Sequence, residues 1–211
     1  CEARCAALAP EIGEAAAIEL YARFVQSYAL HVARLDPDSF DLPETPDRAA
    51  LDAMLAAYED EMDAPFPQDV GRQLSEVLRS MARAWEGTTA RLLRQAKGAP
   101  ADAGLGLVVQ AMALGMGPGE CGSGVIQFVN ARTGEPQVTG RYLSQSQGRE
   151  ALTTGGAIYL TRDPRGPSLE ETEPQVFAEL IRWGGLIRSR LREEMQVEFV
   201  LERGRLAILD G

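Results

Sequence analysis

The residues with the clearest chemical potential form a set of glycines around Ser123. Five glycines fall within ten residues: Gly115, Gly117, Gly119, Gly122 and Gly124. Glycine has no Cβ and adopts left-handed backbone angles, so successive N–H groups in such a segment can turn inward around an anion such as phosphate. We predict that Gly122, Ser123 and Gly124 cradle a phosphate. A mobile hairpin tip is the alternative, because the segment lacks the Gly-Lys-Ser/Thr ending of a P-loop.

A second candidate site lies in the last fifteen residues. Two short strands, 197–201 and 205–209, are predicted on either side of a three-residue loop that ends on a left-handed glycine. This register places Gln196 opposite Asp210 and puts Glu198 and Ile208 on the same face of the hairpin. Magnesium is held by one or two carboxylates together with phosphate oxygens, so Glu198 and Asp210 are candidate metal ligands. A solvated polar face is the alternative.

The cysteines and the histidine give weaker evidence of a functional site than the glycines and carboxylates do. Cys1, Cys5 and Cys121 form neither a disulfide framework nor a Cys-x-x-Cys metal site. Cys121 lies among the glycines, where a small filler residue is favoured over a reactive thiol. His31 is the only histidine, and its helical surroundings favour a surface or packing role.

The secondary structure that must position these residues is predicted to change from helices to mainly strands near residue 100. Residues 1–100 are alanine-rich with helical spacing of apolar side chains, including a helix over 47–62, and we expect a helical subdomain. Residues 101–211 are expected to form an antiparallel sheet with a flanking helix over 173–194. Apolar runs at 107–112 and 125–129 are predicted as strands that enter and leave the glycine segment. The fold class is therefore α+β.

Two neighbouring glycines interrupt the predicted helix of the second half. Gly184 and Gly185 should each cost about 1 kcal/mol relative to alanine in a helix interior. Their presence therefore predicts close packing or a bend at this point.

Composition limits the classes of partner. The chain has 211 residues and a net charge of −10. This acidic balance argues against a nucleic-acid backbone as partner, because proteins that bind one usually present a basic face. No apolar run approaches the roughly 20 residues that span a bilayer. We expect a cytoplasmic protein that does not bind membranes.

Several short motifs resemble, in order and nearly in spacing, the nucleotide-binding domain of the pyruvate, phosphate dikinase family. The resemblance covers roughly residues 17–210. It is carried by Phe66-Pro67-Gln68-Asp69, Val109-Gln110-Ala111-Met112, Gly122-Ser123-Gly124-Val125, Thr133-Gly134-Glu135, Ser146-Gln147-Gly148 and Glu202-Arg203-Gly204. No one of these motifs is specific, but their joint order makes the match strong.

The resemblance implies an ATP-grasp-like partial lobe with ATP and Mg²⁺ as cofactors, and a parent phosphotransferase. Such a kinase interconverts ATP, pyruvate and phosphate with AMP, phosphoenolpyruvate and pyrophosphate. The resemblance also adds Gln110 to the expected nucleotide-binding residues. Arg141 and Arg149 stand where the family usually carries glutamate. They are candidate phosphate ligands, because guanidinium groups bind phosphate bidentately; the alternative, which we favour slightly, is that they mark a diverged site with weakened nucleotide binding. Gln196 and Asp210 look exchanged relative to the family pattern.

The resemblance also implies partners that these residues do not supply. The family's N-terminal lobe and phosphohistidine domain are not recognisable in the sequence. Phosphoryl transfer depends on positioned cations around the moving group, so we expect no catalytic residue here and no turnover by this chain alone. The alternatives are a noncatalytic nucleotide-binding or regulatory module that kept the scaffold, and a structural helical interaction domain. The nucleotide hypothesis requires the amides around Ser123 and the terminal carboxylates to open onto a common cleft.

Overall fold

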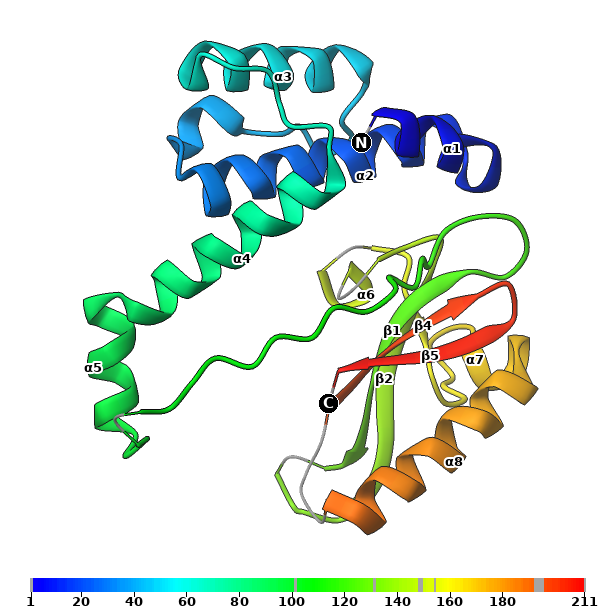
Figure 1. Cartoon of the computed structure of the whole chain (residues 1–211). Coiled ribbons are helices and arrows are strands. Elements are labelled where there is room, and N and C mark those ends of the chain that lie inside the picture. The colour runs from blue at the N-terminus through cyan, green and yellow to red at the C-terminus, as the bar shows by residue number, and fades with distance from the viewer. Residues whose placement is uncertain are drawn as a thin grey trace. The chain divides into compact units, whose positions relative to one another are not determined.

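The computed structural model describes residues 2–100, 102–130, 132–147, 150–153, 155–191 and 196–210, without the side chains of Glu150, Leu191 and Asp210. The chain divides into two compact units, residues 1–110 and 111–211, here called the helical unit and the sheet unit (Figure 1). The helical unit contains α1 (Glu2–Ile12), α2 (Glu14–Tyr28), a π-helical turn η1 (Ala29–Ala33), a 3-10 turn η2 (Pro37–Phe40), α3 (Arg48–Met62), α4 (Val70–Glu86) and α5 (Thr88–Ala96). The sheet unit contains β1 (Gly122–Val129), β2 (Pro136–Ser144), α6 (Glu150–Thr153), β3 (Ile158–Tyr159), α7 (Leu169–Thr172), α8 (Pro174–Leu191), β4 (Gln196–Glu202) and β5 (Arg205–Asp210).

An aromatic cluster holds the helical unit together. The ring of Phe66 lies 5.2 Å from that of Tyr28 and 5.1 Å from that of Tyr58, measured between centroids, in edge-to-face arrangements. Such pairs add stability beyond the area they bury. The contacts join α2 to α3, which run side by side (Figure 1).

The Phe-Pro-x-Asp motif builds the entry to α4. Phe66 is buried in the aromatic cluster, and the carboxylate of Asp69 accepts a hydrogen bond from the backbone N–H of Arg72 at 2.7 Å. This is a helix N-cap, which typically contributes about 1 kcal/mol. The amide of Gln73 also donates to the Pro67 carbonyl at 2.5 Å. In this chain the motif therefore has a clear folding role.

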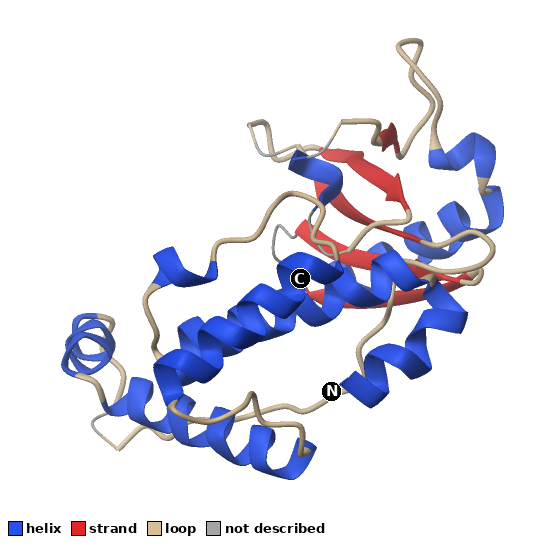
Figure 2. Ribbon diagram, turned by 90° about the horizontal axis from the view of Figure 1, so that it is seen from above, coloured by secondary structure: helices blue, strands red, loops and turns tan. Residues whose placement is uncertain are grey.

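The strands form one antiparallel sheet, drawn in red in Figure 2. Their order is β3-β2-β1-β4-β5. One face forms the core of the unit together with α8, which supplies the buried Val176 and Leu180. The core strand residues include Ile126, Tyr142 and Phe199. The α+β prediction is confirmed.

Strand register assigns the remaining residues to the opposite face. Val125 pairs with Arg141 on one side and with Glu198 on the other. Directly paired residues of antiparallel strands lie on one face, and residues two apart on a strand share it. Ser123 therefore lies on the same face as Val125, Arg141 and Glu198. We call this the polar face.

The structure corrects the predicted strands around the glycines. Residues 107–112 form no strand; they lie in an irregular, exposed segment before β1. Gly122, Ser123 and Gly124, predicted to form a loop, lie in β1 at the centre of the sheet. The apolar, β-branched composition of 107–112 favours a strand, but no neighbouring strand among the described residues pairs with it.

The terminal hairpin also differs from the prediction. Glu202 pairs with Arg205, so the loop has two residues, Arg203 and Gly204, rather than three. Both have positive φ, 52° and 77°, as a two-residue turn that matches strand twist requires. As a result Ile208 pairs with Phe199 on the core face instead of sharing a face with Glu198.

Packing explains three of the glycines. A Cβ on Gly122 would overlap the side chain of Tyr142, and a Cβ on Gly124 would overlap the ring of Phe199. In α8, a Cβ on Gly184 would overlap the ring of Phe128. The predicted close packing at the glycine pair of α8 is therefore confirmed for Gly184. Among the described residues, no helix is long and apolar enough to cross a bilayer.

Candidate functional site

The two candidate magnesium ligands are cross-strand partners in the backbone. Glu198 of β4 pairs directly with Asp210 of β5. The register shifts next to this pair, because β5 carries one extra residue between the partners of Glu198 and Phe199. Asp210 therefore stands opposite Glu198 rather than opposite Gln196. Glu198 is half-buried, and the side chain of Asp210 lies outside the described residues.

Polar groups continue along the same face. Gln127 pairs with Gln196 across β1 and β4, and its amide donates to the Gln196 side-chain oxygen at 3.2 Å. Gln196 and Glu198 are two residues apart on β4, so the two amides and the Glu198 carboxylate share the polar face. A group of this kind offers both oxygen ligands and hydrogen-bond donors.

Arg141 belongs to a separate group at the edge of the sheet. Its guanidinium lies 4.2 Å from the centre of the Tyr159 ring, and that of Arg165 lies 4.8 Å from the same ring. Arg165 also forms an ion pair with Asp163 at 2.7 Å, and the hydrogen bonds from Arg165 lower the pKa of Asp163 to about 2. Two strand spacings, roughly 10 Å, separate the Arg141 position from Glu198. The Arg141 guanidinium therefore lies over β3, and β1 separates the backbone of Arg141 from that of Glu198.

Sequence reasoning missed this edge group. The segment Asp163-Pro164-Arg165-Gly166 carries the residues of a tight turn, and the Gly166 N–H does donate to the Asp163 carbonyl at 3.2 Å. That turn signal could have placed Arg165 close to Asp163. The stack on Tyr159 depends on strand pairing between β2 and β3, which no local pattern revealed.

Ser123 lies in packed structure, not beside open solvent. Its side chain is fully buried, and its hydroxyl lies 2.7 Å from the Ser146 hydroxyl. Its backbone N–H donates to the same Ser146 oxygen at 3.2 Å, and Ser146 donates to the Leu143 carbonyl at 2.7 Å. β1 is also paired on both sides. Gly122, Ser123 and Gly124 therefore do not form the open phosphate cradle expected from their composition.

The space left by Gly122 is filled by Tyr142. The Tyr142 hydroxyl donates to the Glu120 carboxylate at 2.7 Å. Burial, followed by this hydrogen bond, raises the pKa of Tyr142 well above its ordinary value, so the hydroxyl stays protonated at neutral pH. The glycine at position 122 thus leaves room for an aromatic side chain of the core.

The other two candidate nucleotide-binding residues are Gln110 and Arg149. Gln110 is exposed in the irregular segment that ends the helical unit. Arg149 lies outside the described residues.

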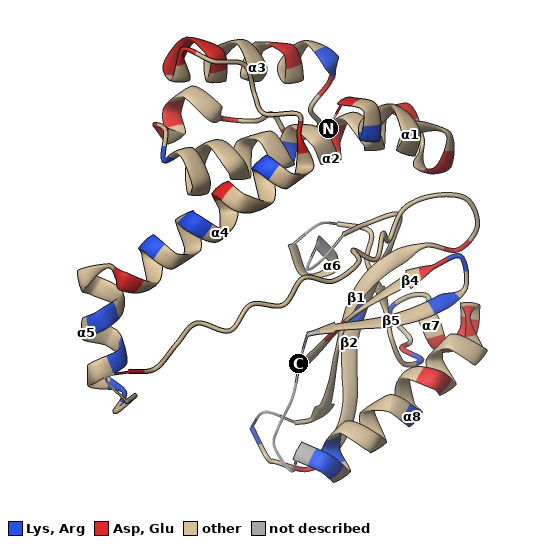
Figure 3. Cartoon of the chain, viewed as in Figure 1, with Lys and Arg blue, Asp and Glu red and all other residues tan. Residues whose placement is uncertain are grey.

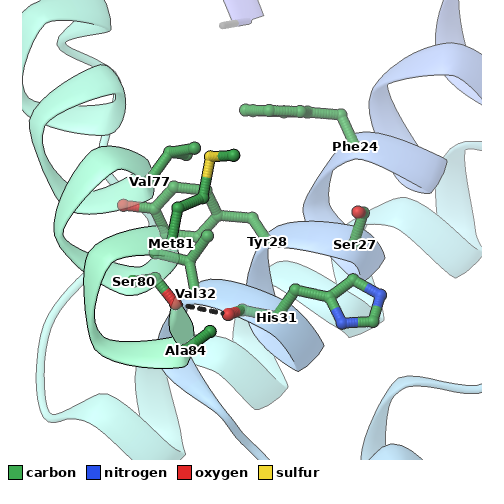
Figure 4. A pocket seen from close by; sticks show the side chains of 9 residues that line it. All are labelled: Phe24, Ser27, Tyr28, His31, Val32, Val77, Ser80, Met81 and Ala84. Atoms are coloured by element: carbon green, nitrogen blue, oxygen red, sulfur yellow. Dashed lines mark hydrogen bonds between the residues drawn. The ribbon is translucent and has the colours of Figure 1, made fainter. Parts of the chain in front are cut away.

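The helical unit has an apolar groove of about 370 Å³ between α2 and η1 on one side and α4 on the other (Figure 4). Phe24, Val77 and Met81 contribute side chains to it. The Ser80 hydroxyl donates to the His31 carbonyl at 2.7 Å, so the backbone of His31 helps to hold η1 against α4. The His31 side chain is exposed, in keeping with the expected surface role.

The donor set fits magnesium better than it fits a phosphate cradle. Two carboxylate positions plus phosphate oxygens are sufficient for Mg²⁺. Among the residues whose side chains are described, no three acidic, histidine or cysteine side chains converge, so a site formed only by protein ligands is not seen there. The β1 backbone, by contrast, is already hydrogen-bonded.

These features define an α+β protein whose antiparallel sheet presents a polar face with a cross-strand acidic pair. The chain is similar in sequence to curated pyruvate, phosphate dikinases. It is 29% identical to "Pyruvate, phosphate dikinase" of Rhizobium meliloti (strain 1021) over 96% of its own length and 25% of the relative. It is 25% identical to "Pyruvate, phosphate dikinase" of Clostridium symbiosum over 92% of this chain and 24% of the relative.

A plant protein, "Pyruvate, phosphate dikinase 2" of Zea mays, is 26% identical over 80% of this chain and 19% of the relative. The chain thus spans about a quarter or less of the length of these curated relatives. No protein-family model matches the chain.

Proposed function

We propose that this chain is part of an ATP-dependent phosphotransferase of the pyruvate, phosphate dikinase type, and that its sheet unit contributes the magnesium-binding part of the ATP site. The observation that carries the proposal is the direct pairing of Glu198 with Asp210 on adjacent strands. The relationship to kinases named for pyruvate and phosphate supports the reaction class.

In this proposal Glu198 and Asp210 bind Mg²⁺ through carboxylate oxygens, and the phosphates of ATP complete its coordination. The metal neutralises charge on the phosphates when it is bound. The amides of Gln127 and Gln196 lie beside Glu198 and are suited to hydrogen-bond a ligand oxygen on the polar face. Gln110, Arg141 and Arg149 stay proposed phosphate contacts of the assembled enzyme.

Turnover needs more cations than this face supplies. Positively charged groups must surround the transferred phosphoryl group, yet Arg141 stacks on Tyr159 at the sheet edge. We therefore expect residues 1–211 alone to bind Mg²⁺-ATP without transferring a phosphoryl group. The N-terminal lobe and phosphohistidine domain of a parent protein are the proposed partners.

The second candidate is the noncatalytic module that kept the scaffold and lost the chemistry, taken here in the regulatory form that no longer binds nucleotide. The specific observation in its favour is the burial of Ser123, whose hydroxyl and amide are both used within the protein. The amides around Ser123 therefore do not meet the expectation of a cleft shared with the terminal carboxylates, and the phosphotransferase proposal keeps only the acidic pair as its ligand site in the sheet unit. The two candidates differ in one measurable property, the Mg²⁺-dependent affinity for ATP.

Isothermal titration of the 211-residue chain with ATP, with and without MgCl₂, separates them. The phosphotransferase proposal predicts saturable binding that requires Mg²⁺ and weakens at least tenfold in E198Q, because a charge-assisted contact typically contributes about 1.5–3 kcal/mol. E202Q is the matched control, since Glu202 lies on the same strand and the same face, four residues away. Absence of Mg²⁺-dependent heat in the wild type supports the noncatalytic module instead.

A further inference from the structure

A second hollow in the helical unit has a different chemistry from the apolar groove. It has a volume of about 280 Å³ and lies between α3, η1 and α4. One side is formed by Val32 and Ala33 of η1 and by Tyr58 and Met62 of α3. The other side is formed by α4. We call it the arginine hollow.

The α4 side of the arginine hollow is cationic. Arg72, Glu76, Arg79 and Arg83 line it, and their spacing of four, three and four residues places them on one face of the helix. Three guanidinium groups thus face one carboxylate. Between Val70 and Lys97 the chain carries six basic and two acidic side chains, although its net charge is −10. Figure 3 shows these basic residues at intervals along α4 and α5.

The single carboxylate is already neutralised within the protein. Glu76 accepts a hydrogen bond from the Tyr28 hydroxyl and one from Arg72 Nε at 2.8 Å. Hydrogen bonds from Arg72 and Tyr28 lower the pKa of Glu76, so it stays ionised and engaged at neutral pH. Its negative charge is thereby matched by Arg72.

Arg79 and Arg83 are exposed, and the charge of Arg79 contributes, after the hydrogen bonds from Arg72 and Tyr28, to the lowered pKa of Glu76. Neither forms an ion pair or hydrogen bond with another residue that the structure describes. They stand one helical turn apart and both line the hollow, a separation that two guanidinium groups can bridge through one tetrahedral oxyanion. Arginine is suited to phosphate because its planar fork donates two parallel hydrogen bonds.

The apolar lining residues indicate which group the ligand carries beside its phosphate. Val32, Ala33 and Met62 are apolar. Tyr58 also lines the hollow, although this residue is only 3% exposed. A cavity of this size holds a small organic group next to an anion, whereas an extended polyanion would use the outer helix surface. We propose that the arginine hollow binds a phosphate monoester with a compact apolar group, with Arg79 and Arg83 on the phosphate. This site lies in the helical unit and does not depend on the proposed ATP site.

Phenyl phosphate, inorganic phosphate and phenol are the probes, titrated calorimetrically into the full chain at constant ionic strength. We expect saturable binding of phenyl phosphate, at least about threefold weaker binding of inorganic phosphate because the ring gains apolar contact, and no measurable binding of phenol. The double variant R79Q/R83Q should weaken phenyl phosphate binding at least about tenfold. R79K/R83K should recover only part of this loss, because lysine keeps the charge without the fork.

R91Q is the matched control, because Arg91 is an exposed arginine of α5 outside the hollow, and it should bind phenyl phosphate as the wild type does. Circular dichroism and thermal melts establish that each variant folds. No binding of phenyl phosphate by the wild type, no loss in R79Q/R83Q, or a loss in R91Q equal to that in R79Q/R83Q would overturn the proposal. E198Q should leave phenyl phosphate binding unchanged, so the proposed ATP site and the arginine hollow can be tested separately.

Discussion

At the scale of single residues, the contrast between Gly184 and Gly185 shows how packing overrides local preference. Both interrupt α8, where glycine is unfavourable. The ring of Phe128 occupies the space that a Cβ on Gly184 would take, while a Cβ on Gly185 would have no neighbour within 4 Å. Gly184 is buried and Gly185 is exposed. One glycine is therefore required by a core side chain, and its neighbour is not.

The variant G184A should lower the free energy of unfolding of the sheet unit by about 1–3 kcal/mol, because the added methyl forces Phe128 to move in a packed core. G185A should raise it by up to about 1 kcal/mol, because alanine is the better helix former. Urea denaturation of both variants measures the difference. Equal effects of the two substitutions would contradict the packing explanation.

Glu76 makes an equally local contribution in the helical unit. Its folded-state pKa lies below the ordinary value of 4.5 because Arg72 and Tyr28 donate to the carboxylate. A lowered carboxyl pKa means that the stabilisation is present above pH 4.5 and is lost as the pH falls below it. E76Q should cost about 1–2 kcal/mol at pH 7. Denaturation of wild type and E76Q between pH 7 and pH 3 should show the two converging; a gap that widens toward acid would contradict this.

At the scale of elements, the sequence predicted helices better than strand pairing. A helix was predicted over 47–62, and α3 runs over Arg48–Met62, with Asp47 accepting a hydrogen bond from the Ala50 N–H at 2.8 Å. Such signals are local. Residues 107–112 have strand composition, but no strand in the described part of the chain pairs with them. Gly122 and Gly124 lie in β1, where Tyr142 and Phe199 occupy the space that a Cβ would take. Partner availability and aromatic packing are nonlocal, so composition could not reveal them.

The candidate site was predictable only in part for the same reason. Glu198 and Asp210 were placed on one hairpin from their alternation with apolar residues, but their direct pairing depends on a bulge. Local sequence does not show where a β-bulge falls. Ser123 was expected to contact a ligand, but its hydroxyl is hydrogen-bonded to Ser146. Ser146 is 23 residues away in the sequence, so no local pattern could reveal this partner.

The turn between β4 and β5 permits a test at this scale. Arg203 has a φ of 52°, which is unfavourable for a long side chain and natural for asparagine, and Gly204 already occupies the second turn position. R203N should therefore stabilise the sheet unit by a few tenths to about 1 kcal/mol. G204A, at a φ of 77°, should destabilise it by about 1 kcal/mol or more. Thermal denaturation measures both, and a stabilising G204A would refute the two-residue turn.

At the scale of the whole molecule, each unit has its own hydrophobic core. Among the described residues, one buried cluster runs from Cys5 to Phe66 and the other from Ile126 to Leu201. Trp85 belongs to the helical unit and Trp183 to the sheet unit. The single-tryptophan variants W183F and W85F therefore each report on one unit.

We expect the two units to unfold in separate transitions. G184A should shift the transition reported by Trp183, and E76Q should shift the one reported by Trp85, with little effect on the other unit. Fluorescence-detected urea denaturation of the four combined variants provides the measurement. Coincident transitions that move together would show that the units unfold as one.

The central claim is that Glu198 and Asp210 together hold the metal of a metal-nucleotide complex. Electron paramagnetic resonance of Mn²⁺, which accepts the same oxygen ligands as Mg²⁺, measures this directly in the presence of ATP. We predict a protein-bound Mn²⁺-ATP signal in the wild type and in E202Q, and its loss in E198Q. A signal that survives in E198Q, or none in the wild type, would contradict the account.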